Sequence, residues 1–127
     1  MMSARAQACF EKFQENVARA ARIEEKLPED KAWSCVVRFY AALHLINAYM
    51  IDKSQVRFDP ASAEQAERKR AMDRCPELRD TPKRYRQLKD ISESVRYDAG
   101  FKYSDEHHTG VKINLDRIIA IVVPKIN

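Results

Sequence analysis

The sequence predicts an all-α protein, an up-and-down bundle of four to five helices in a single domain that spans residues 1–127. Apolar residues recur at spacings of three and four, and the alternating pattern of strands is absent. Only two glycines occur in 127 residues, too few for a series of tight hairpins. Hydrophobic residues make up 45% and charged residues 33%, which is typical of a folded soluble domain. The same shortage of glycine argues against P-loop and dinucleotide-binding enzymes.

Two long helices are predicted in the first half of the chain. The first extends from Ser3, a suitable N-cap, to Leu27, and Pro28 ends it. Its expected apolar face consists of Phe10, Phe13, Val17, Ala20, Ala21 and Leu27. Pro-Glu-Asp then begins a second helix that runs to Asp52 and is apolar on nearly every side. Such a helix lies at the centre of a bundle or faces a partner on its remaining side.

Three further helices are predicted in the second half. Residues 53–60 form a connection, and a short, strongly charged surface helix follows over 61–74. The fourth helix begins at Asp80 or Thr81 and ends near Ala99, with Gly100 as the C′ residue that follows its end. After a polar and aromatic loop over 101–108, Thr109 caps the last helix, which Pro124 closes. Residues 118–123 would suit a strand in isolation, but they continue the helical pattern.

The formal net charge is +4, and the whole surplus lies in residues 57–89, with ten basic and six acidic side chains. Such a run is either a solvated helix face with interleaved acids or a patch that contacts phosphates. Its basic residues include Arg68, Lys69, Arg70, Arg74, Arg79, Lys83, Arg84, Arg86 and Lys89.

A cytoplasmic location is expected, with no membrane partner. The three cysteines are odd in number and widely spaced, which fits reduced thiols. The N-terminal residues lack the apolar stretch of a signal peptide. The most apolar window, residues 32–51, includes an arginine and a histidine and is too polar for a lipid-exposed span.

Polar residues on the second helix are the first candidates for a functional site. Tyr40, His44 and Asn47 recur at i, i+4 and i+7 and therefore share one stripe. They form either a buried structural network or a site at which His44 is a general base or acid. Arg38 projects about 120° away from this stripe.

The fourth helix supplies a second candidate group in Ser92, Arg96 and Tyr97. Arg96 either stabilises the C-terminal end of its own helix or lies across the bundle from His44, where it would hold a phosphate or an acidic side chain. The pair His107-His108 is a weak metal signal because adjacent histidines rarely face one ion. No metal and no other cofactor is predicted.

The helix WSCVVRFYAALHLINAYM, residues 33–50, together with the later SESVRY, residues 92–97, resembles the HEPN superfamily, and most closely its small stand-alone prokaryotic members. The resemblance covers roughly residues 8–122. It implies a helical bundle that usually forms a homodimer. Many members are metal-independent endoribonucleases, often toxins of toxin–antitoxin pairs or phage-defence effectors. Others are non-catalytic, and some pair with a minimal nucleotidyltransferase.

Catalytic HEPN proteins carry Arg-x4–6-His in a late helix, and the resemblance maps onto this chain with a displacement. Arg38 and His44 have the required spacing but lie in the second helix, and Lys102 follows Arg96 where histidine is expected. The candidate catalytic residues are therefore His44 with Arg96, or with Arg38 as the alternative.

The sequence thus predicts a HEPN-like protein that acts on or binds RNA or a nucleotide. The alternative is a non-catalytic helical module that dimerises and docks a partner protein. The candidate binding residues are Tyr40, Asn47, Ser92, Tyr97, Arg68, Lys69 and Arg70.

Overall fold

The computed structural model describes residues 2–53 and 65–126, and every regular element in these two ranges is helical. The predicted all-α bundle is confirmed. The elements, in chain order, are α1 (Ala4–Lys26), η1 (Pro28–Asp30), α2 (Lys31–Lys53), α3 (Gln65–Asp73), η2 (Pro76–Leu78), α4 (Thr81–Tyr97), α5 (Asp105–Val122) and η3 (Val123–Lys125).

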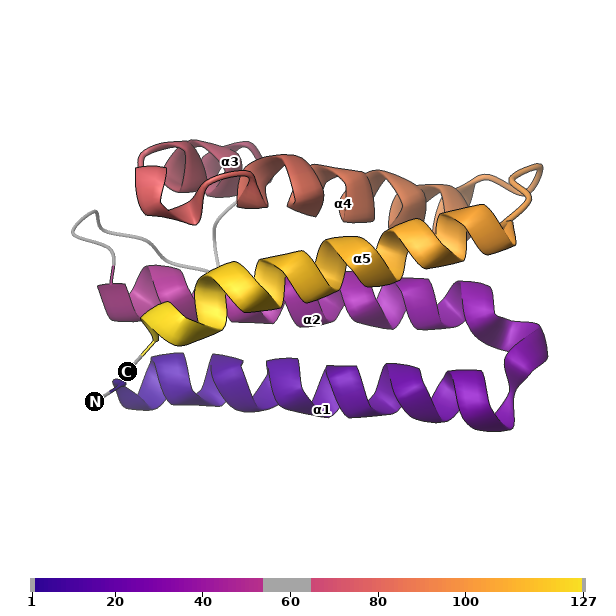
Figure 1. The fold of residues 1–127 in the computed structure, drawn as a ribbon, viewed down its shortest axis with the longest axis horizontal. Coiled ribbons are helices and arrows are strands. Elements are labelled where there is room, and N and C mark those ends of the chain that lie inside the picture. The colour runs from indigo at the N-terminus through magenta and orange to yellow at the C-terminus, as the bar shows by residue number, and fades with distance from the viewer. Residues whose placement is uncertain (1, 54–64, 127) are drawn as a thin grey trace.

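Helices α1 and α2 form an antiparallel hairpin, and α4 and α5 pack on the side of α2 that faces away from α1 (Figure 1). The short helix α3 lies beside one end of α4 (Figure 1). As predicted, Ser3 caps α1, since its hydroxyl accepts the amide hydrogen of Ala6 at 3.2 Å. Pro28 ends the α1 region, and the Pro-Glu-Asp turn is a short 3-10 helix that leads into α2.

The hydrophobic core surrounds α2. Leu45, Ile46 and Met50 of this helix are almost completely buried against α1, α4 and α5. On α1, Phe13 and Ala20 are buried as expected, whereas Ala21 is exposed and Leu27 is 46% exposed. Leu27 follows the helix as its C-cap, so it has left the inward face.

Helices α3 and α4 begin and end differently from the predictions. The expected start of the third helix, at residues 61–64, lies outside the described residues, and α3 ends at Asp73. Helix α4 ends at Tyr97, with Asp98 as the C-cap. The prediction that Gly100 is the C′ residue is wrong, because Ala99 follows the C-cap, and Gly100 does not have a positive φ. The Asp98 side chain instead accepts the Gly100 amide hydrogen at 3.0 Å.

Helix α5 begins one turn earlier than predicted, at Asp105, and Thr109 lies inside it. Ser104 is the N-cap: its hydroxyl accepts the amide hydrogen of His107 at 3.1 Å. In return, Nδ1 of His107 accepts the Ser104 amide hydrogen at 3.1 Å. The imidazole thus takes the place that glutamate has in the usual capping box, which hides the motif from a sequence search. Residues 118–122 are helical, as the continued pattern predicted.

One segment, Pro28–Lys53, is long and apolar enough to cross a membrane by composition alone. However, 78% of its most apolar window is buried inside the bundle, as is usual for the core helix of a water-soluble protein. The segment is therefore weak support for a membrane span, and the fold is compatible with a soluble protein.

Candidate functional site

Helix α2, which lies at the centre of the bundle, keeps one stripe open to solvent. Trp33, Val37, Tyr40 and His44 recur along this stripe, which we call the α2 stripe. Trp33 is 53% exposed and Tyr40 is 37% exposed, while Val37 and His44 are half-buried. Any ligand that reaches α2 must do so along this stripe, because most of the remaining surface of the helix is covered.

Arg96 of α4 borders the α2 stripe and joins three of the predicted site residues. Its Nη1 donates to the Tyr40 hydroxyl at 3.1 Å and to the Tyr97 hydroxyl at 3.5 Å. Its Nε donates to the main-chain carbonyl of Ser92 at 3.2 Å. The guanidinium also lies over the Tyr97 ring, 5.0 Å from its centroid, and 5.6 Å from that of Tyr40. Tyr97 itself is 77% exposed, so an arginine and two accessible tyrosines share one surface.

His44, one turn beyond Tyr40, faces α1. It lines a hollow of about 260 Å³ with Lys12, Glu15, Asn16 and Arg19 of that helix. Burial lowers the pKa of His44 below its ordinary value, and the positive charges of Lys12 and Arg68 lower it further. The imidazole is therefore uncharged near neutral pH, the form in which it can accept a proton.

Asn47 lies one turn further along α2 and binds α3. Its side-chain oxygen accepts a hydrogen bond from Nε of Arg68 at 3.1 Å, and both residues are buried. The expectation that Arg68 belongs to an exposed phosphate-binding patch is therefore wrong. Lys69 and Arg70 are exposed, and Lys69 pairs with Asp73 at 2.9 Å.

The expected pairing of His44 with Arg96 has no direct contact among the described residues. His44 belongs to the α2 stripe and faces α1, whereas Arg96 borders the stripe from the α4 side and extends to Tyr40. The Ser92 side chain is fully buried, so a ligand on the surface does not reach its hydroxyl.

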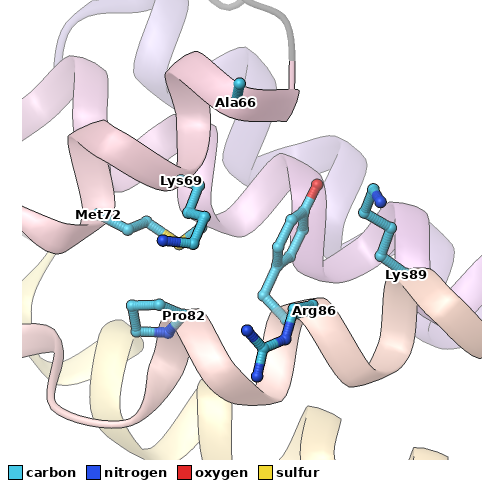
Figure 2. A pocket seen from close by; sticks show the side chains of 7 residues that line it. Ala66, Lys69, Met72, Pro82, Arg86 and Lys89 are labelled. Atoms are coloured by element: carbon cyan, nitrogen blue, oxygen red, sulfur yellow. The ribbon is translucent and has the colours of Figure 1, made fainter.

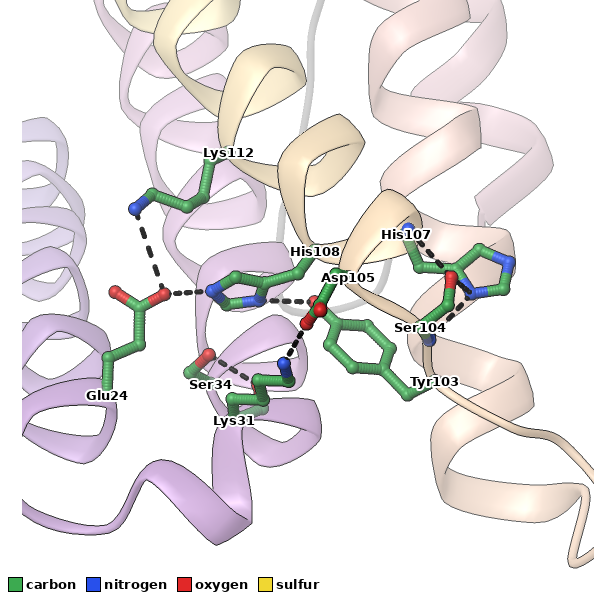
Figure 3. Close-up of polar contacts among 9 residues, drawn as sticks. All are labelled: Glu24, Lys31, Ser34, Tyr103, Ser104, Asp105, His107, His108 and Lys112. Carbon is green, nitrogen blue, oxygen red and sulfur yellow. Dashed lines mark hydrogen bonds and ion pairs between the residues drawn. The ribbon is translucent and has the colours of Figure 1, made fainter.

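Arg38, the alternative catalytic residue, belongs to a mostly covered ionic network. Its Nη2 donates to Glu24 at 2.6 Å, and its Nη1 donates to the Ser34 hydroxyl at 3.0 Å. The other oxygen of Glu24 binds Nε2 of His108, whose Nδ1 contacts the Tyr103 hydroxyl at 2.8 Å (Figure 3). Arg38 is thus buried, and its guanidinium joins α2 to Glu24 of α1. A ligand at the surface does not reach it.

Burial by itself raises the pKa of Glu24. Hydrogen bonds and charges from Arg38 and His108 outweigh that effect and hold the pKa of this carboxyl below its ordinary value. Nζ of Lys112 lies 3.9 Å from the same carboxylate (Figure 3). The contact of His108 with Glu24 could not be predicted from a local pattern, because 84 residues separate the two in the chain. The sequence did contain one indication of a buried ionic network. Arg38 is a charged residue in the middle of a mostly apolar helix, so it needs a partner of opposite charge.

Comparison with models of protein families, with curated proteins and with solved structures finds no match for this chain. The helical bundle agrees with the fold that the HEPN resemblance implies, but the HEPN assignment itself stays a prediction. Within residues 2–53 and 65–126, no group of three or more histidine, cysteine, aspartate or glutamate side chains is arranged to hold a metal ion.

Proposed function

We propose that this protein binds single-stranded RNA, or a nucleotide, across the α2 stripe. The observation that carries the proposal is that the exposed rings of Tyr40 and Tyr97 contact Arg96, while Trp33, two turns before Tyr40 on α2, is also exposed. Proteins bind single strands by stacking bases on such rings, which contributes about 1–3 kcal/mol per base, while cationic side chains contact the phosphates. Arginine also stacks on bases through its planar guanidinium.

The cations that would contact phosphates lie on both sides of the stripe. Arg96 is on the α4 side, and Lys12 and Arg19 line the hollow on the α1 side. Arg19 donates to Asn16 at 3.2 Å, an exposed neutral contact that a phosphate would readily replace. A strand laid along α2 would therefore meet aromatic rings in the middle and positive charge at each edge.

Fluorescence anisotropy with a labelled single-stranded RNA tests this proposal. Trp33→Ser should weaken binding by about 1–3 kcal/mol, the contribution of one stacked base. Lys12→Gln should weaken binding less and lower the slope of log K against log salt by about 0.7. Arg22→Gln is the matched control, because Arg22 is an exposed cation of α1 outside the hollow. Equal affinities for the wild type and the Trp33 and Lys12 variants would contradict the proposal.

Cleavage of the bound RNA is a second candidate function, which the hollow around His44 favours. A neutral imidazole, a carboxylate and two cations line one hollow. His44 would take the proton of a ribose 2′-hydroxyl, whose oxygen then attacks the adjacent phosphorus. The bond to the 5′-oxygen breaks, and this oxygen takes a proton from a water molecule, leaving a 2′,3′-cyclic phosphate. Lys12 and Arg19 would stabilise the charge on the phosphate.

Incubation with total RNA, with and without a chelator, tests the cleavage step. His44→Ala should abolish cleavage while anisotropy still detects binding and circular dichroism shows unchanged helical content. His107→Ala is the control for loss of a histidine elsewhere. Cleavage that is lost with the chelator, or that persists at the same rate in His44→Ala, would remove this mechanism. A toxin or phage-defence role would require cleavage first and stays a prediction.

A different class of function, a non-catalytic module that forms a homodimer or docks a partner such as a nucleotidyltransferase, uses the same surface. Its support is the exposure of Trp33 and Tyr97, since large aromatic side chains are the usual anchors of protein interfaces. Sedimentation equilibrium decides between these functions. A dimer that dissociates in Trp33→Ser, without any RNA affinity in the wild type, would favour the interaction module over RNA binding.

A further inference from the structure

A second hollow, distinct from the α2 stripe, lies between α3 and α4. Its volume is about 200 Å³, and its lining comes from both helices. Met72 of α3 and Pro82 of α4 face each other across it, with Lys69 above them (Figure 2). Met72 and the neighbouring Tyr85 are almost completely buried, so the hollow has an apolar floor.

The sequence of α3 explains why this space is not filled. The residues that α3 presents to the hollow are Ala66, Lys69 and Met72, which are spaced three apart. Alanine is too short to reach α4. Lysine runs its methylene chain along the apolar surface and keeps its ammonium group in water. Met72 is therefore the only one of these three side chains that is buried, and the gap next to it stays open.

Three cations line the hollow: Lys69, Arg86 and Lys89. Two of them have exposed partners one turn away, Lys69 with Asp73 at 2.9 Å and Lys89 with Glu93 at 3.2 Å. Exposed pairs of this kind contribute little and compete weakly with a ligand. Among the residues that the structure describes, Arg86 has no carboxylate partner and is exposed.

We infer that this hollow binds a small organic anion, which places a flat apolar group on Met72 and Pro82 and an anionic group against Arg86 and the two lysines. Ligand sites in proteins combine an apolar lining with a few polar groups in this way. Sites for drug-sized ligands measure about 300–1,000 Å³, so a hollow of about 200 Å³ suits one ring system with one charged substituent. Both a mononucleotide and an aromatic carboxylate have this chemistry.

Titration with 5′-AMP, benzoate, adenosine and inorganic phosphate tests the inference, with the methyl resonances of Met72 and Ala66 as reporters. We expect 5′-AMP or benzoate to shift both methyl signals with saturation. Phosphate alone should leave the Met72 signal unmoved, and adenosine should bind at least about tenfold more weakly than 5′-AMP if the site takes nucleotides. A response to 5′-AMP alone identifies a nucleotide, whereas a response to benzoate alone identifies a carboxylate. If neither moves the Met72 methyl, the inference is wrong.

Two variants test whether the changes in the methyl resonances arise from binding in the hollow. Arg86→Gln should weaken binding of the anion about tenfold or more, with Arg22→Gln as the matched control. Ala66→Leu fills the space without changing a charge, and it should abolish binding while the melting curve stays that of a folded protein. Undiminished affinity in Ala66→Leu would overturn the inference. Trp33→Ser, which tests the α2 stripe, should leave the Met72 shifts unchanged, so the two proposals fail separately.

Discussion

Replacement of Arg38 by methionine tests the energetic role of the ionic network at the closed end of the α1–α2 hairpin. Methionine approximates the aliphatic part of the arginine side chain but lacks the guanidinium group, so both of its hydrogen bonds are removed. Glu24 then loses its 2.6 Å partner, and Ser34 loses a 3.0 Å donor. The Glu24 carboxylate would remain in contact with His108 and near Lys112, but in a largely covered position.

The expected loss of stability is about 3 kcal/mol. The side chain of Arg38 is 9% exposed and that of Glu24 is 21% exposed. Breaking a buried pair by removing one partner costs about 3–5 kcal/mol, and the partial exposure of Glu24 places this pair at the lower end. Glu24→Gln should lower the free energy of unfolding by less. Arg38 can still donate hydrogen bonds to the Ser34 hydroxyl and to the neutral amide at position 24. The double variant should lose less than the sum of the two single losses.

Urea unfolding, followed by circular dichroism, measures these differences. With a slope of about 2 kcal/mol per molar, the transition midpoint of Arg38→Met should fall by about 1.5 M at pH 7. The pH dependence has a definite sign. Since the folded pKa of Glu24 is lowered, its stabilisation is fully present above the unfolded value of about 4.3 and is lost as pH falls through the folded pKa.

The difference in the free energy of unfolding between the wild type and Arg38→Met should therefore become smaller below pH 4. Lys112→Met is a control, since its ammonium group lies 3.9 Å from the same carboxylate and is half exposed. It should change the free energy of unfolding by less than about 1 kcal/mol. A loss below about 1 kcal/mol in Arg38→Met, or single losses that add fully in the double variant, would refute the assignment of this network as a structural support.

Three further predictions concern the core, the caps and the thiols. Leu45→Ala, at a completely buried position, should lower the free energy of unfolding by about 2–5 kcal/mol in the same urea experiment, and a loss below 1 kcal/mol would contradict the core described above. Ser104→Ala should cost about 1 kcal/mol by removing the N-cap of α5, whereas an unchanged midpoint would argue against that cap. Burial raises the pKa of Cys35 to about 11, so this thiol should react with Ellman's reagent at pH 8 only after unfolding; rapid titration of all three thiols in the native protein would count against its burial.

The helices could be predicted from the amino-acid sequence, because the apolar spacing and the proline positions are local properties. Ser3 as the N-cap of α1 and Pro28 as the residue that ends it were both predictable, because each prediction needs only the few residues next to it. The same holds for the central position of α2, since a helix with so few polar residues must be covered on most faces. The N-cap of α5 was harder to predict. His107 takes the position that glutamate or glutamine has in the usual capping box, so the motif does not show in the sequence.

The contacts between polar side chains of different helices depend on how the helices pack, and the sequence did not predict them. Arg38 and Arg68 are both cations in sequence, but packing buries the first against Glu24 and the second against Asn47. Arg96 remains at the surface, where it joins Tyr40 across 56 positions of chain. These contacts depend on how the helices are rotated against one another, and helix rotation is set by the fit of side chains from different helices. A local sequence pattern predicts the apolar face of each helix, but it does not predict which residue of another helix each charged side chain contacts.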